Sequence, residues 1–340
     1  MTQATFTNWI PVEYGAQVIQ KVTQHSAIEA YGQNVFMTSA SRYISRDGGV
    51  TAALVQKGAT YLAAGQGDLG LNNAVLLTAG KWGTEIDIAE EDIMDSLADI
   101  INSKSNAIGT ALAKVYDNAS IGVTAAPGAS NASTTSVWYG LTNSDANTGY
   151  IAGANLIVTG AGTKGIPTYT QISTALSFVE QGDYFNEEDM ICVAHPFFRN
   201  AFRTILDSQN RPIFNESSAG FPGGGQGATP DLLFRIPVFW SLGAVVTAAP
   251  TSALPANGYS GASASCPTGT AGNRLMFFCN RLYLLAGKRT TNPNNPAATP
   301  EFQIVPPMYS GTDTTILRGR MRRAFSMGQE AAFGMIEGTQ

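Results

Sequence analysis

The chain carries little charge for its length. Only 13% of its 340 residues are Asp, Glu, Lys or Arg, whereas an ordinary soluble domain has about 25%. A compact monomer of this size would expose roughly 13,000 Å² to water. The 25 acidic and 20 basic side chains cover such a surface thinly. This shortage predicts that much of the surface faces other protein, as in a subunit of an assembly.

Cysteines and long apolar runs are also scarce. The three cysteines, Cys192, Cys266 and Cys279, are an odd number and lack the spacing of a zinc site, so we expect reduced thiols and no disulfide framework. The best apolar run, Leu275 to Leu285, is interrupted by polar residues and falls short of the ~18 residues that a membrane span needs. The N-terminus lacks the features of a signal peptide. We therefore expect a protein that stays in the cytosol until lysis, with no membrane partner.

Positive charge is missing from the start of the chain. No lysine or arginine precedes Lys21, and the net charge is −5. The basic arm that would neutralise phosphates and make nucleic-acid binding depend on salt is therefore absent. If the protein encloses DNA, something other than its own charge must drive the DNA in.

The first half of the chain predicts a short helix, a long hairpin and a long helix. Residues 12–31 place apolar side chains at roughly helical spacing. Residues 42–80 contain the turn signal Asp47-Gly48-Gly49 between strand-like runs, followed by several glycines. They predict a twisted two-stranded ribbon with little core of its own. Such a ribbon is marginal alone, so we expect it to lie on a neighbouring molecule.

Residues 84–119 hold the clearest helical pattern. Apolar side chains recur at spacings near 3.6 at Ile93, Leu97, Ile100, Ile108, Leu112 and Val115. Acidic residues crowd the start and two lysines lie in the later half, an order that suits the helix dipole. The pattern predicts a single helix of about thirty residues, some 45 Å long.

The second half predicts an irregular stretch, an α/β region and then strands. Residues 123–165 are rich in Gly, Ala, Ser and Thr and predict loops and short strands. Residues 167–250 predict a helix beginning near Tyr169, a strand at 190–195, a helix after Pro196 and two strands, 232–240 and 243–249. The remaining residues predict mostly strand.

Residues 314–327 alternate between two different faces. One face carries an arginine ladder and the other is mostly apolar, although it includes Arg323. Three interpretations are open: contact with DNA phosphate, pairing with acidic residues of another subunit, or a solvated strand face. We favour pairing, because bidentate arginine suits fixed interfaces. The candidate contacts are Arg318, Arg320, Arg322 and Arg323.

Glycine-rich motifs offer a nucleotide-binding alternative. The segment Gly160 to Gly165 formally matches GxGxxG, and Glu180 lies twenty residues beyond Gly160. However, Ile166-Pro167 interrupt the junction between glycines and helix, and no preceding parallel βαβ unit is evident. The GGGQG segment at 223–227 lacks the Lys-Ser/Thr of a P-loop. A surface loop is therefore the favoured interpretation of both.

Catalytic and metal signals are weak. The two histidines, His25 and His195, have no nucleophile motif such as GxSxG beside them. The acidic cluster Glu85 to Asp99 could hold a divalent cation through its oxygens, but carboxylates at a helix start are the favoured explanation. We predict no catalysis, no cofactor and no metal.

The order of these elements resembles the major capsid proteins of tailed bacteriophages, which have the Hong Kong 97 coat fold, an α+β fold. Four local patterns are similar to the family and occur in the expected order: residues 85–96, 195–214, 232–241 and 316–336. The sequence departs from the family at Asn210-Arg211-Pro212, where Gly-Arg-Pro is commoner. The resemblance covers nearly the whole chain.

The resemblance implies a division into family regions. These are an N-terminal arm (1–41), an E-loop β-hairpin (42–80), a peripheral domain with a spine helix (81–122), a Gly/Ser/Thr-rich insertion that could decorate the shell (123–165), an axial domain (166–272) and return strands to the peripheral domain (273–340). No long helical segment precedes the arm, so a separate scaffolding protein, or none, is implied.

The resemblance also implies a structural role without catalysis. Hexamers and pentamers would tile an icosahedral head around double-stranded DNA, with a portal and optionally a decoration protein as partners, after assembly in the bacterial cytoplasm. Some relatives cross-link a hairpin lysine to a neighbour, which makes Lys57, the only lysine of the hairpin, a further intersubunit candidate. The alternatives are an encapsulin-like nanocompartment shell and, more distantly, a nucleotide-dependent enzyme using residues 160–165.

Overall fold

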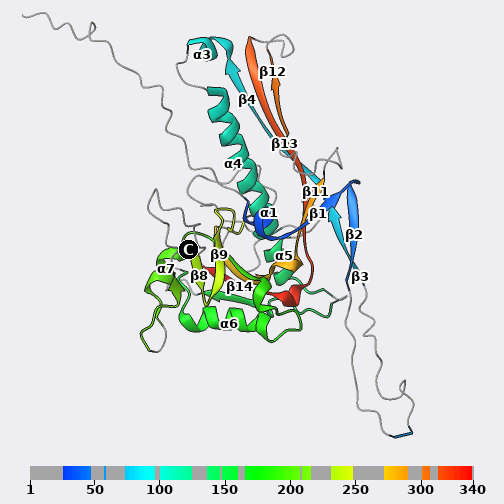
Figure 1. Ribbon diagram of the computed structural model, residues 1–340, viewed down its shortest axis with the longest axis vertical. Helices are drawn as coiled ribbons and strands as arrows, with labels where there is room; N and C mark the ends of the chain where they lie inside the picture. Colours follow the sequence, from blue (N-terminus) through cyan, green and yellow to red (C-terminus); the bar gives the residue numbers. More distant parts are fainter. Residues whose placement is uncertain are drawn as a thin grey trace, which may run out of the picture.

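Three β-sheets organise the part of the chain that the structure describes. The computed structural model describes residues 26–46, 57–58, 73–95, 100–124, 136–145, 148–159, 165–206, 209–215, 231–247, 272–289, 301–306 and 313–338. In Figure 1 a long projection of strands and one helix rises from a body built on a second sheet, and a hairpin leaves the side. The resulting fold is α+β, as predicted.

The projection is a five-stranded sheet. Its strands are β1 (Gln33–Met37), β4 (Gly80–Ala89), β11 (Leu284–Arg289), β12 (Glu301–Val305) and β13 (Thr314–Met327). They follow the order β1-β11-β13-β12, with β4 paired to β13. β4 runs antiparallel to residues 314–323 of β13, while β12 and β11 follow one another along its opposite side. β13 therefore connects most of the sheet.

Helix α4 (Ile100–Ile121) lies along this sheet, and the short α3 (Glu90–Asp95) lies at the tip of the projection (Figure 1). The prediction of one helix over 84–119 is wrong at its start, because residues 84–89 complete β4. Their polar and apolar side chains alternate, and register with β13 from Thr84↔Gly319 to Ala89↔Thr314 satisfies the backbone. Glu85 and Asp87 thus lie on a strand and do not start a helix.

The body contains a seven-stranded sheet. Its strands are β5 (Leu156–Thr159), β6 (Met190–Ala194), β7 (Phe214–Asn215), β8 (Asp231–Leu233), β9 (Ile236–Trp240), β10 (Arg274–Asn280) and β14 (Phe333–Gly338). Their order is β5-β14-β10-β6-β9-β8-β7. The central strands β6 and β14 are buried at every residue. This explains the continuous apolar sequence of β6.

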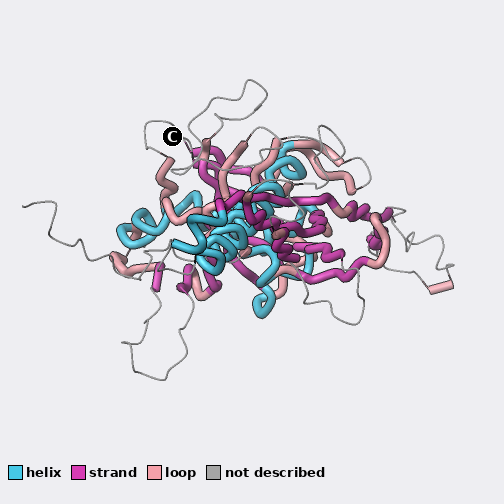
Figure 2. Tube along the Cα trace, turned by 90° about the horizontal axis from the view of Figure 1, so that it is seen from above, coloured by secondary structure: helices cyan, strands magenta, loops and turns pink. Residues whose placement is uncertain are grey.

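Short helices surround this sheet. They are α1 (Ala27–Tyr31), α5 (Val137–Thr142), α6 (Tyr169–Glu180), α7 (Phe198–Thr204) and the 3-10 turns η3 (Glu187–Asp189), η4 (Arg281–Tyr283) and η5 (Glu330–Ala332). α6 begins with a capping box in which Thr168 and Gln171 exchange hydrogen bonds, and it packs on β14 and β10. Seen from above, helices and strands intermix at the centre of the molecule (Figure 2).

The structure confirms α6, β6 and α7 but corrects two predicted strands. Residues 232–240 are not one strand: the chain turns at Phe234 and Arg235, which have φ angles of 51° and 68°, and forms the β8–β9 hairpin. Residues 243–247 make only isolated bridges. Asn210 has a φ of 59°, in the left-handed region that glycine adopts most readily. This explains why glycine suits that position in the family that the sequence resembles.

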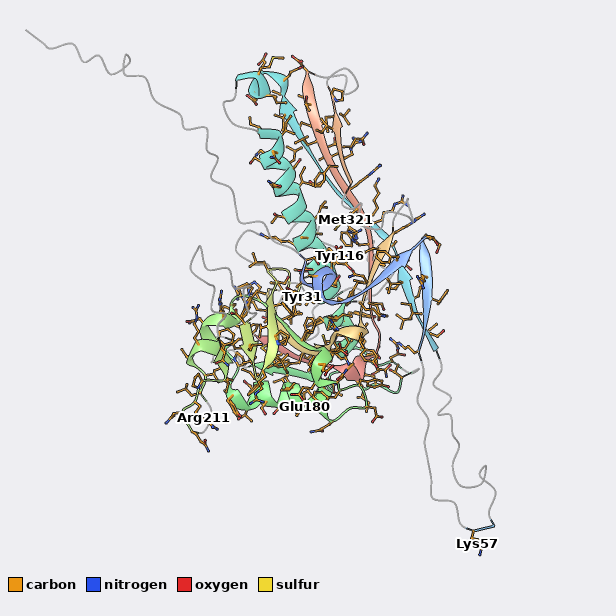
Figure 3. All side chains as sticks on the ribbon, in the orientation of Figure 1. Tyr31, Lys57, Tyr116, Glu180, Arg211 and Met321 are labelled. Carbon is orange, nitrogen blue, oxygen red and sulfur yellow. The ribbon has the colours of Figure 1, made fainter. Side chains whose placement is uncertain are left out.

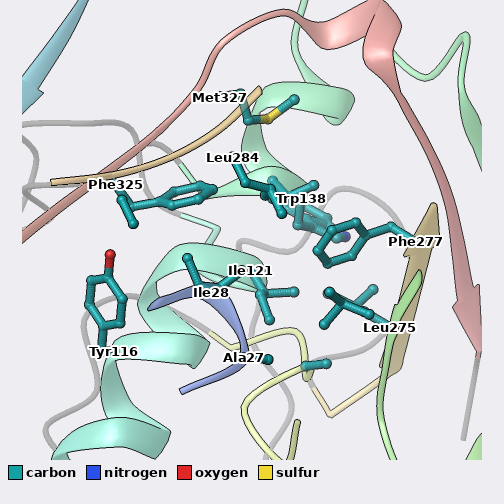
Figure 4. Close-up of a cluster of buried hydrophobic side chains, with 14 of the residues drawn as sticks. Ala27, Ile28, Tyr116, Ile121, Trp138, Leu275, Phe277, Leu284, Phe325 and Met327 are labelled. Carbon is teal, nitrogen blue, oxygen red and sulfur yellow. The ribbon is translucent and has the colours of Figure 1, made fainter. Parts of the chain in front are cut away.

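The two large sheets share one core. Leu284 and Phe325 come from the five-stranded sheet and Leu275 and Phe277 from the seven-stranded sheet, yet they belong to one buried cluster (Figure 4). Trp138 of α5 is fully buried in the same cluster. The described parts of 123–165 therefore contribute to the core, and β5 pairs with β14. That this stretch decorates the shell stays a prediction.

The strands of residues 273–340 divide between the two large sheets, whereas we expected them to return to one domain. β11, β12 and β13 lie in the five-stranded sheet, but β10 and β14 lie in the seven-stranded sheet. The region 273–340 therefore crosses between the two sheets. Its backbone holds the projection and the body together.

Gly319 permits the close approach of α4 to β13. A Cβ atom at this position would overlap the Cγ2 atom of Ile108 and come within 3.5 Å of the Cδ1 atom of Leu112. Both neighbours are buried residues of α4. The missing side chain therefore sets the distance between helix and sheet.

We expect Gly319→Val to destabilise the protein by about 1–3 kcal/mol, because overpacking forces the helix away from the sheet. Gln303→Val, on the exposed part of β12, is the control and should change stability by less than about 0.5 kcal/mol. Urea unfolding of both variants measures the difference. Equal stability of the two variants would contradict this account of the packing.

Candidate interaction surfaces

The exposed face of β13 carries the predicted arginine ladder. Burial alternates along residues 314–322, so that Arg318, Arg320 and Arg322 share the face opposite α4. In the antiparallel register, Glu85 of β4 lies opposite Arg318, and Lys81 lies opposite Arg322. The side-chain alternation predicted for this strand is therefore confirmed.

Arg318 has an acidic partner within its own chain. Its Nε atom lies 2.8 Å from Oε2 of Glu85, and the two side chains are 42% and 44% exposed. An ion pair this exposed contributes about 0–1 kcal/mol to stability. Arg318 therefore pairs with β4 of its own chain. A contact of Arg318 with another subunit stays a prediction.

A shallow pocket of about 450 Å³ opens on the same face. Gly83, which lies opposite Arg320, leaves room between the charged side chains. The pocket is lined by Lys81, Gly83, Thr84, Glu85, Arg318, Gly319 and Arg320. Its cations and open shape suit small anionic groups such as carboxylates or phosphates.

Arg323 is different from the rest of the ladder. It is 1% exposed, and its Nε atom donates to Oε1 of Glu29 while its Nη2 atom lies 3.5 Å from Oε2 of the same residue. Lys288 of β11 lies 3.6 Å from Glu29. Arg323 therefore ties α1 to the five-stranded sheet, and its predicted contact with another subunit is not supported by its burial in the chain.

Asp117 holds three segments together inside the protein. Its carboxylate, on α4, accepts hydrogen bonds from the Ser26 hydroxyl, from the Ala27 backbone N–H at 3.1 Å and from the Ser241 hydroxyl at 2.6 Å. Burial raises its pKa from 3.8 to about 6, although these hydrogen bonds lower it. Next to it, the Tyr116 hydroxyl donates to the Ala324 carbonyl at 2.9 Å. Figure 3 shows Tyr31 and Tyr116 near one another, where α1 meets α4.

The raised pKa of Asp117 makes stability depend on pH in a defined direction. The folded protein binds a proton on Asp117 more tightly than the unfolded chain does. The stabilisation that this proton gives is therefore largest below pH 4 and is lost as the pH rises through about 6. The loss is about 3 kcal/mol at most. We expect Asp117→Asn to remove this slope, whereas the exposed Asp87→Asn should keep it. Urea unfolding at pH 4, 5, 6 and 7 measures it, and an unchanged slope in Asp117→Asn would refute the assignment.

The base of the predicted hairpin is confirmed. β2 (Ser41–Arg46) pairs antiparallel with β3 (Asn73–Thr78), from Ser41↔Thr78 to Arg46↔Asn73. Val75 and Leu77 pack inward in a small cluster with Met37 and Leu285. The opposite face exposes Tyr43, at 70%, and Leu76, at 44%. The turn signal at 47–49 lies outside the described residues.

Lys57 lies far from the strands that form the base of the hairpin (Figure 3). It is exposed and adjoins Gly58, whose φ is 85°. Its role in contact or cross-linking stays a prediction.

Arg46 fixes the end of β2 to the body. Its Nη1 atom lies 3.2 Å from Oδ2 of Asp145, and its Nη2 atom lies 3.2 Å from Oε1 of Glu330 and 3.1 Å from the Met327 carbonyl. The Arg46 and Glu330 side chains are only 12% and 8% exposed. Sequence reasoning missed this site because its members are distant in sequence and share no motif.

Removing the cation should leave the buried Glu330 carboxylate uncompensated. We expect Arg46→Met to cost about 3 kcal/mol of stability, while Arg42→Met on the exposed part of the same strand should cost less than about 1 kcal/mol. The double variant Arg46→Met/Glu330→Met should recover part of the loss. Thermal and urea unfolding provide the measurement, and equal losses in the two single variants would contradict an anchoring role.

The remaining candidates for chemistry have structural explanations. The Nδ1 atom of His195 accepts a hydrogen bond from the Phe197 backbone at 3.1 Å, at the start of α7, and burial lowers its pKa to about 4. Burial raises the pKa of the free thiols of Cys192 and Cys279. Cys266, His25 and residues 160–164 of the glycine motif lie outside the described residues. Among the residues that the structure describes, no group of three or more potential metal ligands occurs.

Within the described ranges, no helix combines the length and the apolar character that crossing a bilayer requires.

Comparison with known proteins finds similarity at the level of structure. No protein-family model matches the sequence, and no curated protein matches it significantly. The capsid of a native GTA particle matches with a TM-score of 0.63 at 12% identity, covering 99% of this chain and 98% of that chain. A chain from Mycobacterium phage Ogopogo matches with a TM-score of 0.64 at 12% identity, covering 99% of both chains.

A third solved structure agrees with these two. The capsid structure of cyanophage P-SCSP1u matches with a TM-score of 0.60 at 16% identity, covering 100% of this chain and 96% of that chain. Matches over nearly the full length of each chain show that this chain shares their fold.

Proposed function

We propose that this chain, which has the Hong Kong 97 coat fold, is the major capsid protein of a tailed double-stranded DNA phage. The observation that carries the proposal is the match to phage and GTA capsid structures over nearly the full length of both chains. A match this complete includes the projection, the body and the connections between them. The low charge noted in the sequence supports the same conclusion.

The surfaces that a single chain leaves open support an assembly role. The outer face of the β2–β3 hairpin exposes Tyr43 and Leu76, and the edge strand β12 exposes Phe302 and Ile304 at 47% and 55%. Exposed aromatic and branched side chains on projecting strands are typical of contact surfaces. Interfaces of about 2,000–5,000 Å², at roughly 25 cal/mol per Å², would offset the cost of ordering such extended segments.

In this proposal, copies of the chain form hexamers and pentamers that tile an icosahedral head. The head would enclose DNA without sequence-specific binding, and the net charge of −5 argues against tight binding of its phosphates. A separate scaffolding protein, a portal and optionally a decoration protein are the proposed partners. Assembly would take place in the bacterial cytoplasm, and the product would be the virion head.

The alternatives have less support. A nanocompartment shell would use the same fold, but two of the three similar structures named above are capsids, one of a GTA particle and one of a cyanophage. An enzymatic role would need a site, and Ile166-Pro167 separate the glycine motif at 160–165 from helix α6, whose start would have to hold a phosphate. We therefore propose a structural role without catalysis.

Electron microscopy and gradient sedimentation of the expressed chain test the proposal. We expect shells when lysate from phage-infected cells supplies the missing assembly factors, and free capsomers or irregular aggregates without it. Uniform small shells from the chain alone would favour the nanocompartment. A compact solitary monomer at every concentration and in every mixture would refute both.

A further inference from the structure

Two cations face each other at one end of the long sheet. Lys81 of β4 and Arg322 of β13 are directly opposite in the antiparallel register, and both are exposed. Directly opposed side chains in such a pair have Cβ atoms about 4.5–5.5 Å apart, and like charges there are destabilising. An external anionic group would remove this repulsion.

The acidic residues farther along β4 are too far away to remove the repulsion between Lys81 and Arg322. Glu85 is four residues beyond Lys81 and forms the ion pair with Arg318. Asp87 lies opposite Ile316, six residues from Lys81, which corresponds to about 20 Å of strand. Exposed charges separated by more than about 8 Å are largely screened at physiological ionic strength.

The opposite end of the same strand carries the opposite charge. α3 begins directly after β4, and its first turn contains Glu90, Glu91 and Asp92. Glu91 and Asp92 are exposed, and Met94 beside them is 75% exposed. α3 lies at the tip of the projection (Figure 1), about 26 Å of strand away from Lys81. The acidic tip of one molecule therefore cannot reach its own basic end.

We propose that the basic end of the sheet, formed by Lys81 and Arg322, binds the acidic α3 tip of a second copy of this chain. This inference rests on the proposed function and names one contact of the assembly. Because the two surfaces differ and lie at opposite ends of one strand, the contact is heterologous. Contacts of this kind generate rings or extended lattices and not isolated pairs.

A protein carboxylate suits this surface better than DNA does. Glu85 and Asp87 lie on the same exposed face as the cations and would repel a continuous polyanion. Two or three carboxylates on a short helix can instead approach the basic end alone, and arginine binds carboxylates with paired hydrogen bonds.

Charge exchange tests the contact. We expect Lys81→Glu/Arg322→Glu to reduce the yield of sedimenting shells at least tenfold, and the addition of Glu91→Lys/Asp92→Lys in the same chain to restore most of the yield. Lys104→Glu, on the exposed side of α4, is the control and should assemble normally. Circular dichroism and thermal unfolding of the subunits show that each variant is folded.

Normal assembly by the folded Lys81→Glu/Arg322→Glu variant would overturn the proposal. The proposal would also be overturned if the Lys81→Glu/Arg322→Glu variant assembled empty shells normally and lost only the binding of duplex DNA. The basic end of the sheet would then contact phosphate. A failure of the added Glu91→Lys/Asp92→Lys changes to restore assembly would overturn the assignment of α3 as the partner.

A second measurement is independent of shell formation. Chains carrying Arg322→Cys and chains carrying Asp92→Cys are mixed under mild oxidation, and each single variant alone is the control. We expect a disulfide-linked dimer only in the mixture, and its absence would overturn the contact. A linked dimer from a chain that never forms shells would support the contact while refuting the proposed function.

Discussion

The structure depends on the two-faced character of β13. This strand pairs with β4, β11 and β12, and one of its faces must be buried against α4 while the other meets water. Gly319 allows the helix to approach, and the alternating arginines keep the opposite face polar. Because strand side chains alternate with a period of two, a shift by one residue would bury the arginines and expose the apolar side chains. Burial therefore determines the register, and the register determines which charges lie opposite one another.

Buried contacts hold the junction between projection and body together. Its apolar cluster contains residues of both large sheets. Asp117 binds the start of α1 and Ser241, and Arg323 binds Glu29 from the same helix. A helix of five residues has little stability of its own. These buried contacts hold α1 in place.

The parts of the molecule that lack such support are those that extend outward. The hairpin has an inward face of a few apolar side chains, and its base is held by Arg46. The outer strands of the projection expose apolar and charged side chains together. Such surfaces gain stability when they are covered by other molecules, which connects the low charge of the chain with a role in assembly. The acidic tip and the basic end of the same sheet add direction to that association.

Sequence patterns alone determined the features that depend on local periodicity. These include the alternation of β13, the helix α6 and the buried strand β6, because the spacing of apolar side chains acts between near neighbours in the chain. Tertiary structure decided the features that depend on contacts between distant parts of the chain. The predicted helix includes residues 84–89, but their polar and apolar side chains alternate, and β4 pairs with ten residues of β13, which makes them part of a strand. The tertiary structure also decided that Trp138 lies in the core, that Arg46 binds Glu330, and that Arg323 is buried against Glu29. Arg46 and Glu330, Trp138 and its hydrogen-bond partner Glu337, and Arg323 and Glu29 are separated by 199 to 294 residues, and only the folded chain brings them together.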